Sequence, residues 1–178
     1  MKSVANLLFE ARILKHTPRS GFHFLGAGKE SVAEHSFMTT FIGYVMSHLE
    51  PHADARKLIS LCLVHDLPEA RISDLNYVHK RYVTPDESGA VRDMTEGLSF
   101  GKSLTALIEE FQAAETLESR LAHDADQLAF VLDLKALSDV GFTPPQNWLP
   151  SVKRLSTTAI VWWRNSISAK KNYHSLTF

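Results

Sequence analysis

The stretch ARKLISLCLVHDLPE at residues 55–69 contains a helical pattern that ends at an adjacent histidine and aspartate. Its apolar positions recur at three- and four-residue spacing, which predicts a helix: Ala55, Leu58, Ile59, Cys62 and Leu63. Pro68 lacks an amide hydrogen and crowds the preceding turn, so the helix is expected to kink or end there. His65 and Asp66 are therefore predicted to lie near the C-terminal end of a helix.

A second helix is predicted just before this one in the chain. Residues 31–34 read SVAE, a capping box in which Ser31 accepts a hydrogen bond from the Glu34 amide while Glu34 bonds back. His35 then lies in the first turn of that helix, and Pro51 ends it.

Helices are also predicted at both ends of the chain. Ser3 is the expected N-cap of a first helix, which stops before residues 17–18 (Thr-Pro). Thr116 is expected to cap a helix that ends at Gly141, and a last helix is predicted at about residues 149–171.

The pattern as a whole predicts an all-α fold in a single domain. Residues 71–89 read as a long irregular segment, and such segments often carry function. No period-two apolar alternation bounded by hairpin turns is present in the sequence. A length of 178 residues with 44% hydrophobic residues is enough to bury one core, and no linker or repeat divides residues 1–178.

Composition limits the partners and the compartment. A formal net charge of -1 gives no bulk attraction to nucleic acid or to an anionic membrane. Residues 1–10 break their apolar run too early for a signal peptide, and no stretch reaches the roughly 18 apolar residues of a membrane span. The single Cys62 is expected to pack as a small hydrophobe. We expect a soluble, cytoplasmic protein.

Four potential metal ligands stand on three of the predicted helices: His35, His65, Asp66 and Asp126. Two imidazoles and two carboxylates suit one borderline or hard divalent ion, such as manganese, cobalt, iron, nickel or zinc. Four protein ligands leave open positions for water and a phosphoryl oxygen. The spacing alone is weakly specific, because adjacent His-Asp pairs occur by chance in many helices.

The order of these four residues resembles the H…HD…D signature of the HD-domain metal-dependent phosphohydrolases. Further stretches are similar, in the same order, to motifs of the bacterial 5'-deoxynucleotidase branch and its eukaryotic relatives: residues 18–22 (PRSGF), 30–36 (ESVAEHS), 64–69 (VHDLPE) with Asp74, and 125–127 (ADQ). The resemblance covers about residues 1–140.

This resemblance implies a compact HD-domain bundle of about six or more helices, with a metal-binding core at about residues 1–140. The predicted helix at about residues 149–171 would pack on that core. The implied activity is hydrolysis of deoxynucleoside 5'-monophosphates to deoxynucleoside and phosphate with one divalent metal ion. Members of the family are commonly homodimers, which makes a homodimer the expected assembly.

Two acids are candidates for proton transfer. Glu69 follows His65 by four residues, one helical turn if the helix survives Pro68, so its carboxylate can face the site without being a ligand. Asp74 matches a family acid near the metal and the substrate; it can handle a proton or bond to the sugar. Its alternative role is the N-cap of a following helix.

Two residues are candidates for substrate binding. Arg19 matches the family's phosphate-contacting arginine and can grip a phosphate with two parallel donors, although it also fits an exposed loop cation. Phe22 stands where relatives often carry tryptophan. Its ring either packs against the deoxyribose or base, or belongs to the core.

Residues 76–82 (NYVHKRY) depart from the relatives, which more often carry a short apolar, proline-containing stretch here. Lys80 and Arg81 can add cationic contacts to a larger phosphorylated substrate, and Tyr77 and Tyr82 can stack on a base. The more ordinary interpretation is a solvated loop face with its packing anchors.

Other features are interpreted as structural. Asp124 lies about 200° around the helix from Asp126 and therefore points elsewhere, so the pair His123-Asp124 is left out of the site. Residues 151–178 are basic and contain Trp162 and Trp163, a composition that allows nucleic-acid binding. The cations fall singly or in pairs on a helical period, which favours a solvated helix face with the tryptophans on the packed side and also allows a dimer contact.

Two other functions stay open at this point. The same metal centre can act on another phosphomonoester or on a phosphodiester, because a shared fold does not fix specificity. A non-catalytic, metal-dependent nucleotide-binding module is the alternative from another class.

Overall fold

The computed structural model describes residues 2–142 and residue 155, and the regular elements in that part are helices. The elements are α1 (Lys2–Ile13), α2 (Phe22–Leu25), α3 (Val32–Leu49), α4 (Ala55–Val64), α5 (Glu69–Ile72), a 3-10 turn (His79–Arg81), α6 (Glu87–Thr95), α7 (Gly101–Ala113) and α8 (Leu117–Asp139). The described residues add one isolated antiparallel bridge, Pro18 with Ser31. The predicted all-α fold is confirmed.

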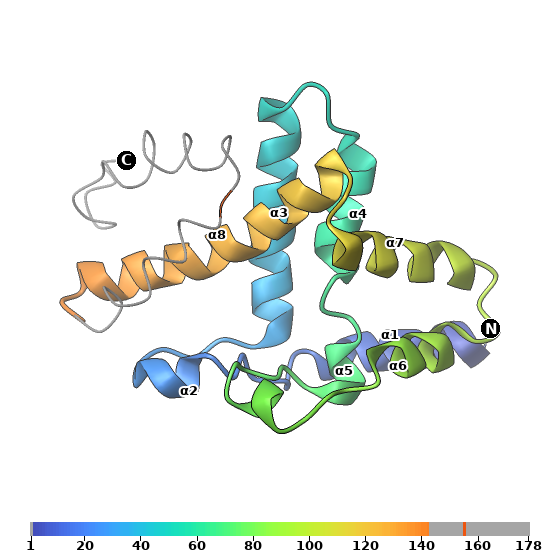
Figure 1. Ribbon diagram of the computed structural model, residues 1–178, viewed down its shortest axis with the longest axis horizontal. Helices are drawn as coiled ribbons and strands as arrows, with labels where there is room; N and C mark the ends of the chain where they lie inside the picture. Colours follow the sequence, from blue (N-terminus) through green and yellow to red (C-terminus); the bar gives the residue numbers. More distant parts are fainter. Residues whose placement is uncertain (1, 143–154, 156–178) are drawn as a thin grey trace.

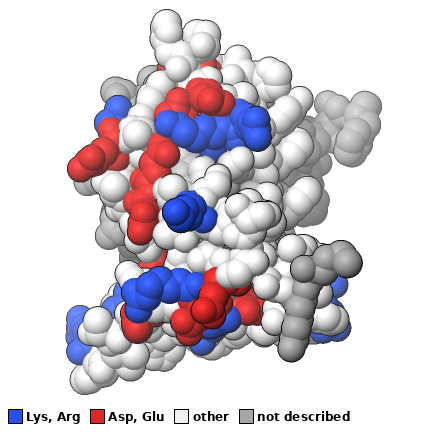
Figure 2. Space-filling model, turned by 90° about the vertical axis from the view of Figure 1, so that its right-hand side faces the viewer, with Lys and Arg blue, Asp and Glu red and all other residues white. Residues whose placement is uncertain are grey.

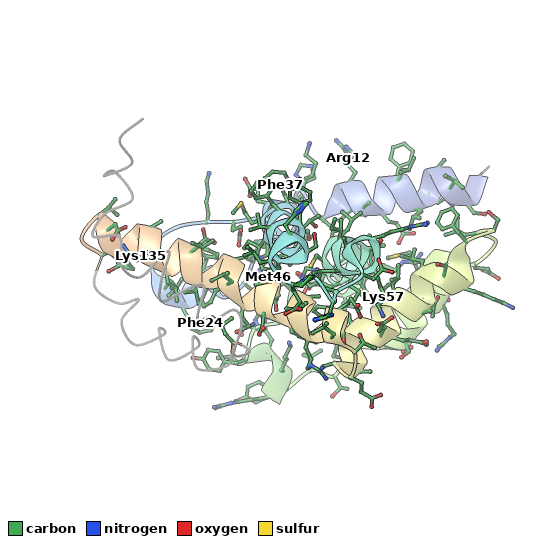
Figure 3. All side chains as sticks on the ribbon, turned by 90° about the horizontal axis from the view of Figure 1, so that it is seen from above. Arg12, Phe24, Phe37, Met46, Lys57 and Lys135 are labelled. Atoms are coloured by element: carbon green, nitrogen blue, oxygen red, sulfur yellow. The ribbon has the colours of Figure 1, made fainter. Side chains whose placement is uncertain are left out.

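Three helices form the centre of the molecule. α3 and α4 run side by side and α8 crosses them, while α1, α5 and α6 lie together at one end (Figure 1). The core between the three central helices includes Leu58, Leu61, Leu128 and Val131, none of which is accessible to solvent. Seen from above, Met46 lies between α3 and α8, whereas Phe37 points away from the bundle (Figure 3). Burying each such side chain stabilises the fold by about 1.5–3 kcal/mol.

The close approach of α3 and α4 depends on one glycine. A Cβ placed on Gly43 would lie 2.6 Å from the Cys62 sulfur, so a larger residue would push the two helices apart. Cys62 itself is fully buried, as expected, and burial followed by the nearby charge of Asp126 raises the pKa of its thiol to about 12.

The predicted helix starts are confirmed at the two positions that matter for the site. Ser31 Oγ accepts from the Glu34 amide at 3.2 Å, and the Ser31 amide donates to Glu34 Oε2 at 2.7 Å. Thr116 caps α8 with Ser119 as its partner. These caps fix where α3 and α8 begin, and therefore which residues their first turns present.

Two sequence predictions need correction. Ser3 lies inside α1, which begins at Lys2, and so is not an N-cap. Residues 71–89 are not one irregular segment, because α5 extends to Ile72, a 3-10 turn interrupts the segment, and Asp86 starts α6 by accepting from the Gly89 amide at 2.8 Å. α6 and α7 were not predicted. The helix predicted at residues 149–171 lies outside the described residues, of which Leu155 packs into the central core.

The surface of the described residues carries charged side chains of both signs and a row of aromatic side chains. Acidic and basic side chains are interspersed on the face drawn in Figure 2. No helix in the described part of the chain is long and apolar enough to cross a membrane. The outer face of α3 exposes Phe37, Phe41 and Tyr44 in a row. The homodimer and the cytoplasmic location stay predictions.

Candidate metal centre

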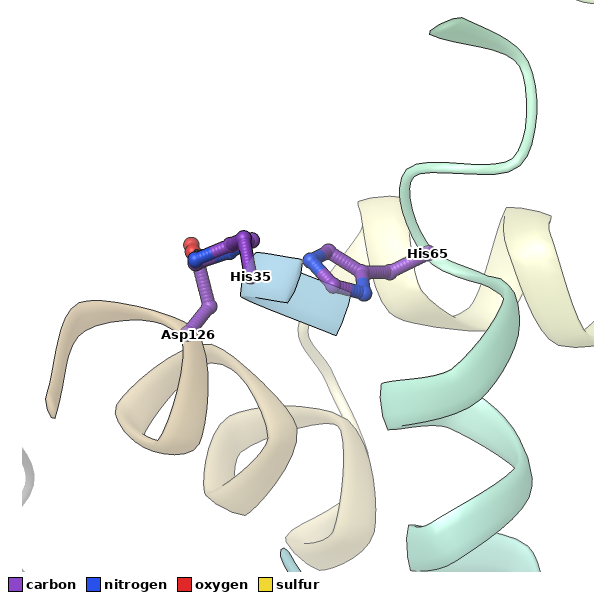
Figure 4. A group of neighbouring side chains, drawn as sticks. All are labelled: His35, His65 and Asp126. Atoms are coloured by element: carbon purple, nitrogen blue, oxygen red, sulfur yellow. Dashed lines mark hydrogen bonds and ion pairs between the residues drawn. The ribbon is translucent and has the colours of Figure 1, made fainter. Parts of the chain in front are cut away.

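Side chains from three separate segments meet at the centre of the bundle. His35 lies in the first turn of α3, His65 is the C-cap of α4, and Asp126 lies in α8. One donor atom of each lies within 4.8 Å of the others, and the three face a common point (Figure 4). Both histidines are buried. Two nitrogens and an oxygen at this spacing can ligate one metal ion.

His35 and Asp126 form the closest pair in this group. The His35 Nε2 atom lies 2.9 Å from Asp126 Oδ1. Burial alone would raise the pKa of the Asp126 carboxyl, but the hydrogen bond and the charge of His35, with further charge from His65, hold it well below its usual range. Asp126 is therefore a carboxylate at neutral pH, the form that binds a cation.

His65 is oriented by the end of its own helix. Its Nδ1 lies 2.8 Å from the Cys62 carbonyl oxygen, and because a carbonyl can only accept, Nδ1 carries a hydrogen. Nε2 is buried, makes no hydrogen bond, and faces the other donors. Fixing one ring nitrogen so that the other points at a metal is how ligating histidines are usually held.

Asp66 lies beside the two imidazoles. Its Oδ2 is 3.2 Å from His65 Nε2 and 3.7 Å from His35 Nε2, although Asp66 is not among the three residues whose donor atoms are all mutually close. Burial opposes ionisation of Asp66, but the charges of His65 and Arg19 outweigh it and lower the pKa. The structure thus brings all four predicted ligands to one place.

Arg19 extends from the loop between α1 and α2 into the group of acids. Its guanidinium lies 3.3 Å from Asp66 Oδ2 and 3.9 Å from the nearest oxygens of Asp74 and Asp126. Its backbone amide donates to the Glu30 carbonyl at 2.9 Å, which anchors the loop beside the start of α3. Arg19 is thus not an exposed loop cation.

Glu69 begins α5 directly after Pro68, and its Oε2 is buried without a hydrogen bond. Burial, followed by the charges of Asp66 and Asp74, raises the pKa of Glu69 to about 9. A buried carboxyl that holds a proton near neutral pH is suited to proton transfer.

Asp74 ties two loops together. Its Oδ2 accepts from the Ser20 amide at 2.8 Å, which joins the loop of Arg19 to the segment after α5. The alternative role of Asp74 as a helix N-cap is therefore wrong, since the next helix, α6, is capped by Asp86. The contact across the chain places the Asp74 carboxylate beside the guanidinium of Arg19.

A cavity of about 480 Å³ opens above these groups. It is lined by Arg19, Gly21, Phe22, His65, Asp66, Glu69, Asp74, Leu75, Asn76, Tyr77, Lys80, Phe111, Asp126, Gln127 and Phe130. Phe22 is only 8% exposed and packs its ring edge-on against Phe130, with centroids 6.4 Å apart. Both interpretations of Phe22 therefore hold in part, because the ring belongs to a small core cluster and also lines the cavity.

His123 and Asp124 are not among the residues that line the cavity. The His123 ring stacks on Phe111 at 4.0 Å, and its Nε2 lies 2.8 Å from the Phe111 carbonyl oxygen. Phe111 in turn lies 4.9 Å from the His65 ring. His123 thus supports a wall of the cavity from behind.

One residue near the site was missed at the level of sequence. Glu30 Oε2 lies 3.8 Å from His35 Nδ1, and both atoms are buried without a hydrogen bond. Burial, followed by the charge of Asp133, raises the pKa of Glu30 to about 8. In the sequence, Glu30 appears only as the first residue of the motif at residues 30–36. Its spacing from His35 does not indicate that the loop before α3 brings the two side chains together.

The residues present fit a divalent cation. The Nε2 of His65 is a buried nitrogen without a hydrogen bond, directed at two carboxylates and a second imidazole. The guanidinium of Arg19 lies within 4 Å of three carboxylates, those of Asp66, Asp74 and Asp126. A cation here would offset the negative charge of these carboxylates.

Comparison with known proteins gives a consistent family. The HD domain family matches residues 11–159, a range that contains all the site residues named above. The chain is 26% identical over 152 residues to a Bos taurus protein named 5'-deoxynucleotidase HDDC2, covering 80% of this chain and 73% of that protein. A protein of the same name from Dictyostelium discoideum is 28% identical over 114 residues, covering 58% of this chain and 60% of that protein.

A solved structure shows the same fold. A conserved hypothetical protein from Pyrococcus furiosus superposes with a TM-score of 0.75 at 28% sequence identity, covering 85% of this chain and 88% of that chain. The arrangement of the helices is thus shared over most of the length of both chains.

Proposed function

Because the chain belongs to the HD-domain family of metal-dependent phosphohydrolases, we propose that it is a 5'-deoxynucleotidase. The reaction is hydrolysis of a deoxynucleoside 5'-monophosphate to a deoxynucleoside and phosphate. The two relatives named 5'-deoxynucleotidase support this substrate class. At 26% and 28% identity they leave the substrate to be tested by experiment.

The observation that carries the proposal is that groups suited to bind a cation and a guanidinium suited to bind a phosphate line one cavity. His65, Asp66 and Asp126 line it, and Arg19, which lies 3.3 Å from Asp66, lines it as well. A phosphate at this place can be bound by the guanidinium through two parallel hydrogen bonds. The proposed metal ligands are His35, His65, Asp66 and Asp126.

A divalent ion bound by these ligands would supply a Lewis acid for the phosphoryl group and would acidify water. Manganese, cobalt, iron, nickel and zinc all accept histidine and carboxylate ligands. Arg19 then binds the phosphate and offsets the charge that develops on its oxygens. This role requires Arg19 to stay beside the acids, as the bond from its amide to the Glu30 carbonyl ensures.

Glu69 is the proposed proton-transfer group. It lines the cavity, and its Oε2 has no competing hydrogen bond, which leaves the carboxyl able to exchange a proton with substrate or water. Asp74 has its Oδ2 engaged by the Ser20 amide, and we assign it to orienting the Arg19 loop and bonding to the substrate. Phe22 supplies an apolar wall for the sugar or base.

The experiment is a phosphate-release screen of the purified protein with manganese or cobalt. The substrates are deoxyribonucleoside and ribonucleoside 5'-monophosphates together with non-nucleotide phosphomonoesters and a phosphodiester. The proposal expects release from the deoxyribonucleotides, and Glu69→Gln should lower kcat by at least about a hundredfold. The matched control is Glu109→Gln, an exposed carboxylate on α7, which should leave the rate unchanged.

Two results would contradict the proposal in different ways. Exclusive activity on non-nucleotide phosphates would support a phosphohydrolase but would exclude deoxynucleoside monophosphates as its substrates. Tight binding of a deoxynucleotide without any phosphate release would instead indicate a nucleotide-binding module.

A further inference from the structure

The mouth of the cavity is formed by a short turn whose shape is fixed by one buried side chain. Asn76 is 8% exposed, and its Oδ1 accepts from the Val78 amide at 3.0 Å and from the His79 amide at 3.1 Å. Its carbonyl oxygen accepts from the Lys80 amide at 3.0 Å. Side-chain bonds of this kind fix the backbone of a turn. Residues 77 and 79–82 are exposed, so this segment is a solvated loop face, as the ordinary interpretation expected, and Asn76 is its packing anchor.

This turn places Tyr77 at the edge of the cavity. Tyr77 lines the cavity while remaining 54% exposed. Its ring packs against Phe24 of α2, with centroids 5.3 Å apart and planes tilted by 48°. An aromatic ring that is supported by a neighbour and still half exposed can receive a flat ligand with little further ordering cost.

The cavity combines charged and aromatic side chains. Its lining includes Arg19, Lys80 and three of the proposed metal ligands, and it also includes four aromatic rings: Phe22, Tyr77, Phe111 and Phe130. Its volume of about 480 Å³ lies in the range of small-molecule sites. A nucleotide likewise combines an anionic phosphate with a flat, weakly polar base, and the half-exposed Tyr77 is an aromatic surface away from the buried ligands.

We propose that Tyr77 is the stacking surface for the nucleobase of the substrate. This assignment rests on the proposed function, because it places the phosphate at Arg19 and the base toward the mouth. Stacking on an aromatic side chain accepts every base, since each has a π-face. Tyr77 therefore separates nucleotides from base-free sugar phosphates and contributes little to choice among the bases.

The test compares two substrates that differ only in the base. They are deoxyadenosine 5'-monophosphate and 2-deoxyribose 5-phosphate, which share the sugar and the phosphate. Tyr77→Ala should raise KM for the nucleotide about tenfold, as expected for one lost stacking contact. KM for the sugar phosphate and kcat for both should stay within about twofold of the parent protein.

Three variants make the test specific. Tyr77→Phe keeps the ring and should keep the parent KM for the nucleotide. Tyr77→Leu keeps much of the bulk without a π-face and should behave like Tyr77→Ala. It replaces the alanine variant in the test if that variant does not fold. Tyr82→Ala removes a tyrosine that is 83% exposed and does not line the cavity. This variant should keep the parent KM for both substrates.

The proposal is overturned if Tyr77→Ala and Tyr77→Leu keep the parent KM for the nucleotide. It is also overturned if these variants raise KM equally for the nucleotide and for the sugar phosphate. If the parent protein releases phosphate from neither compound, the proposed hydrolysis fails on its own. Calorimetric titration of deoxyadenosine 5'-monophosphate into the parent and into Tyr77→Leu then decides the stacking contact. A Kd about tenfold weaker in the variant supports it, and an equal or undetectable affinity in both overturns it.

Discussion

Replacing Glu69 by glutamine should stabilise the metal-free protein at neutral pH. Glutamine has the shape of the protonated acid but cannot ionise. Folding raises the pKa of Glu69 from an ordinary 4.5 to about 9, because the side chain is buried beside Asp66 and Asp74. Between these two values the folded state holds a proton that the unfolded state has lost, so stability falls as the pH rises.

The size of the effect follows from the width of that pH window. Each pH unit above 4.5 costs the parent protein about 1.4 kcal/mol of unfolding free energy until the folded pKa is reached. At pH 7, Glu69→Gln should therefore be more stable than the parent by about 3 kcal/mol. The difference should disappear near pH 4.5 and stop growing near pH 9.

The assay is urea unfolding with a chelator present, followed by circular dichroism at several pH values from 4.5 to 9. Glu109→Gln is the matched control, because it removes an exposed carboxylate and should change stability by less than about 0.5 kcal/mol. A difference between Glu69→Gln and the parent that does not vary with pH would refute the argument, since only a shifted pKa makes it vary.

Three further outcomes are expected. Asp126→Ala should weaken manganese or cobalt binding at least about tenfold in equilibrium dialysis, whereas Glu69→Gln should bind the ion as tightly as the parent; equal loss in both would make Glu69 a ligand. Ser31→Ala should lower the unfolding free energy by about 1 kcal/mol in urea, because it removes the cap of α3; no loss would mean that water replaces the cap. Leu128→Ala should cost about 3 kcal/mol in the same assay, because the side chain is fully buried, and a cost below about 1 kcal/mol would show that the core collapses around the gap.

The parts of the fold that could be predicted from the sequence are those that depend on short-range signals. The capping boxes at Ser31 and Thr116 start α3 and α8, and Pro68 separates α4 from α5. These signals act over three or four residues and can be interpreted without a structure. They are also enough to place His35 in a first turn and His65 at a helix end.

The contacts that complete the site are of another kind. Arg19 meets Asp66 across 47 residues of chain, and the Ser20 amide meets Asp74 across 54. No local pattern at Arg19 or Asp74 indicates these pairings, which depend on how two loops are packed at one end of the bundle. The resemblance to a family indicated that both residues belong to the site, and the structure supplies how each is bonded.

The helices α6 and α7 were not predicted, although each carries buried apolar residues at helical spacing: Ala90, Val91 and Met94 in α6, and Leu104 and Ile108 in α7. The start of α7 has no side-chain cap, so no short-range signal marks it. Tertiary packing of Val91 and Met94 against Leu104 and Ile108 decides that this stretch is helical.

Two acids of the site, Asp66 and Glu69, differ in their surroundings. Asp66 and Glu69 lie three residues apart on the same turn of chain and are both desolvated. Asp66 faces His65 and Arg19, which lower its pKa, whereas Glu69 faces Asp66 and Asp74, which help burial to raise its pKa to about 9. Groups whose pKa values are pushed apart in this way have different chemical roles. This difference supports the proposal that Asp66 binds a cation and that Glu69 transfers a proton.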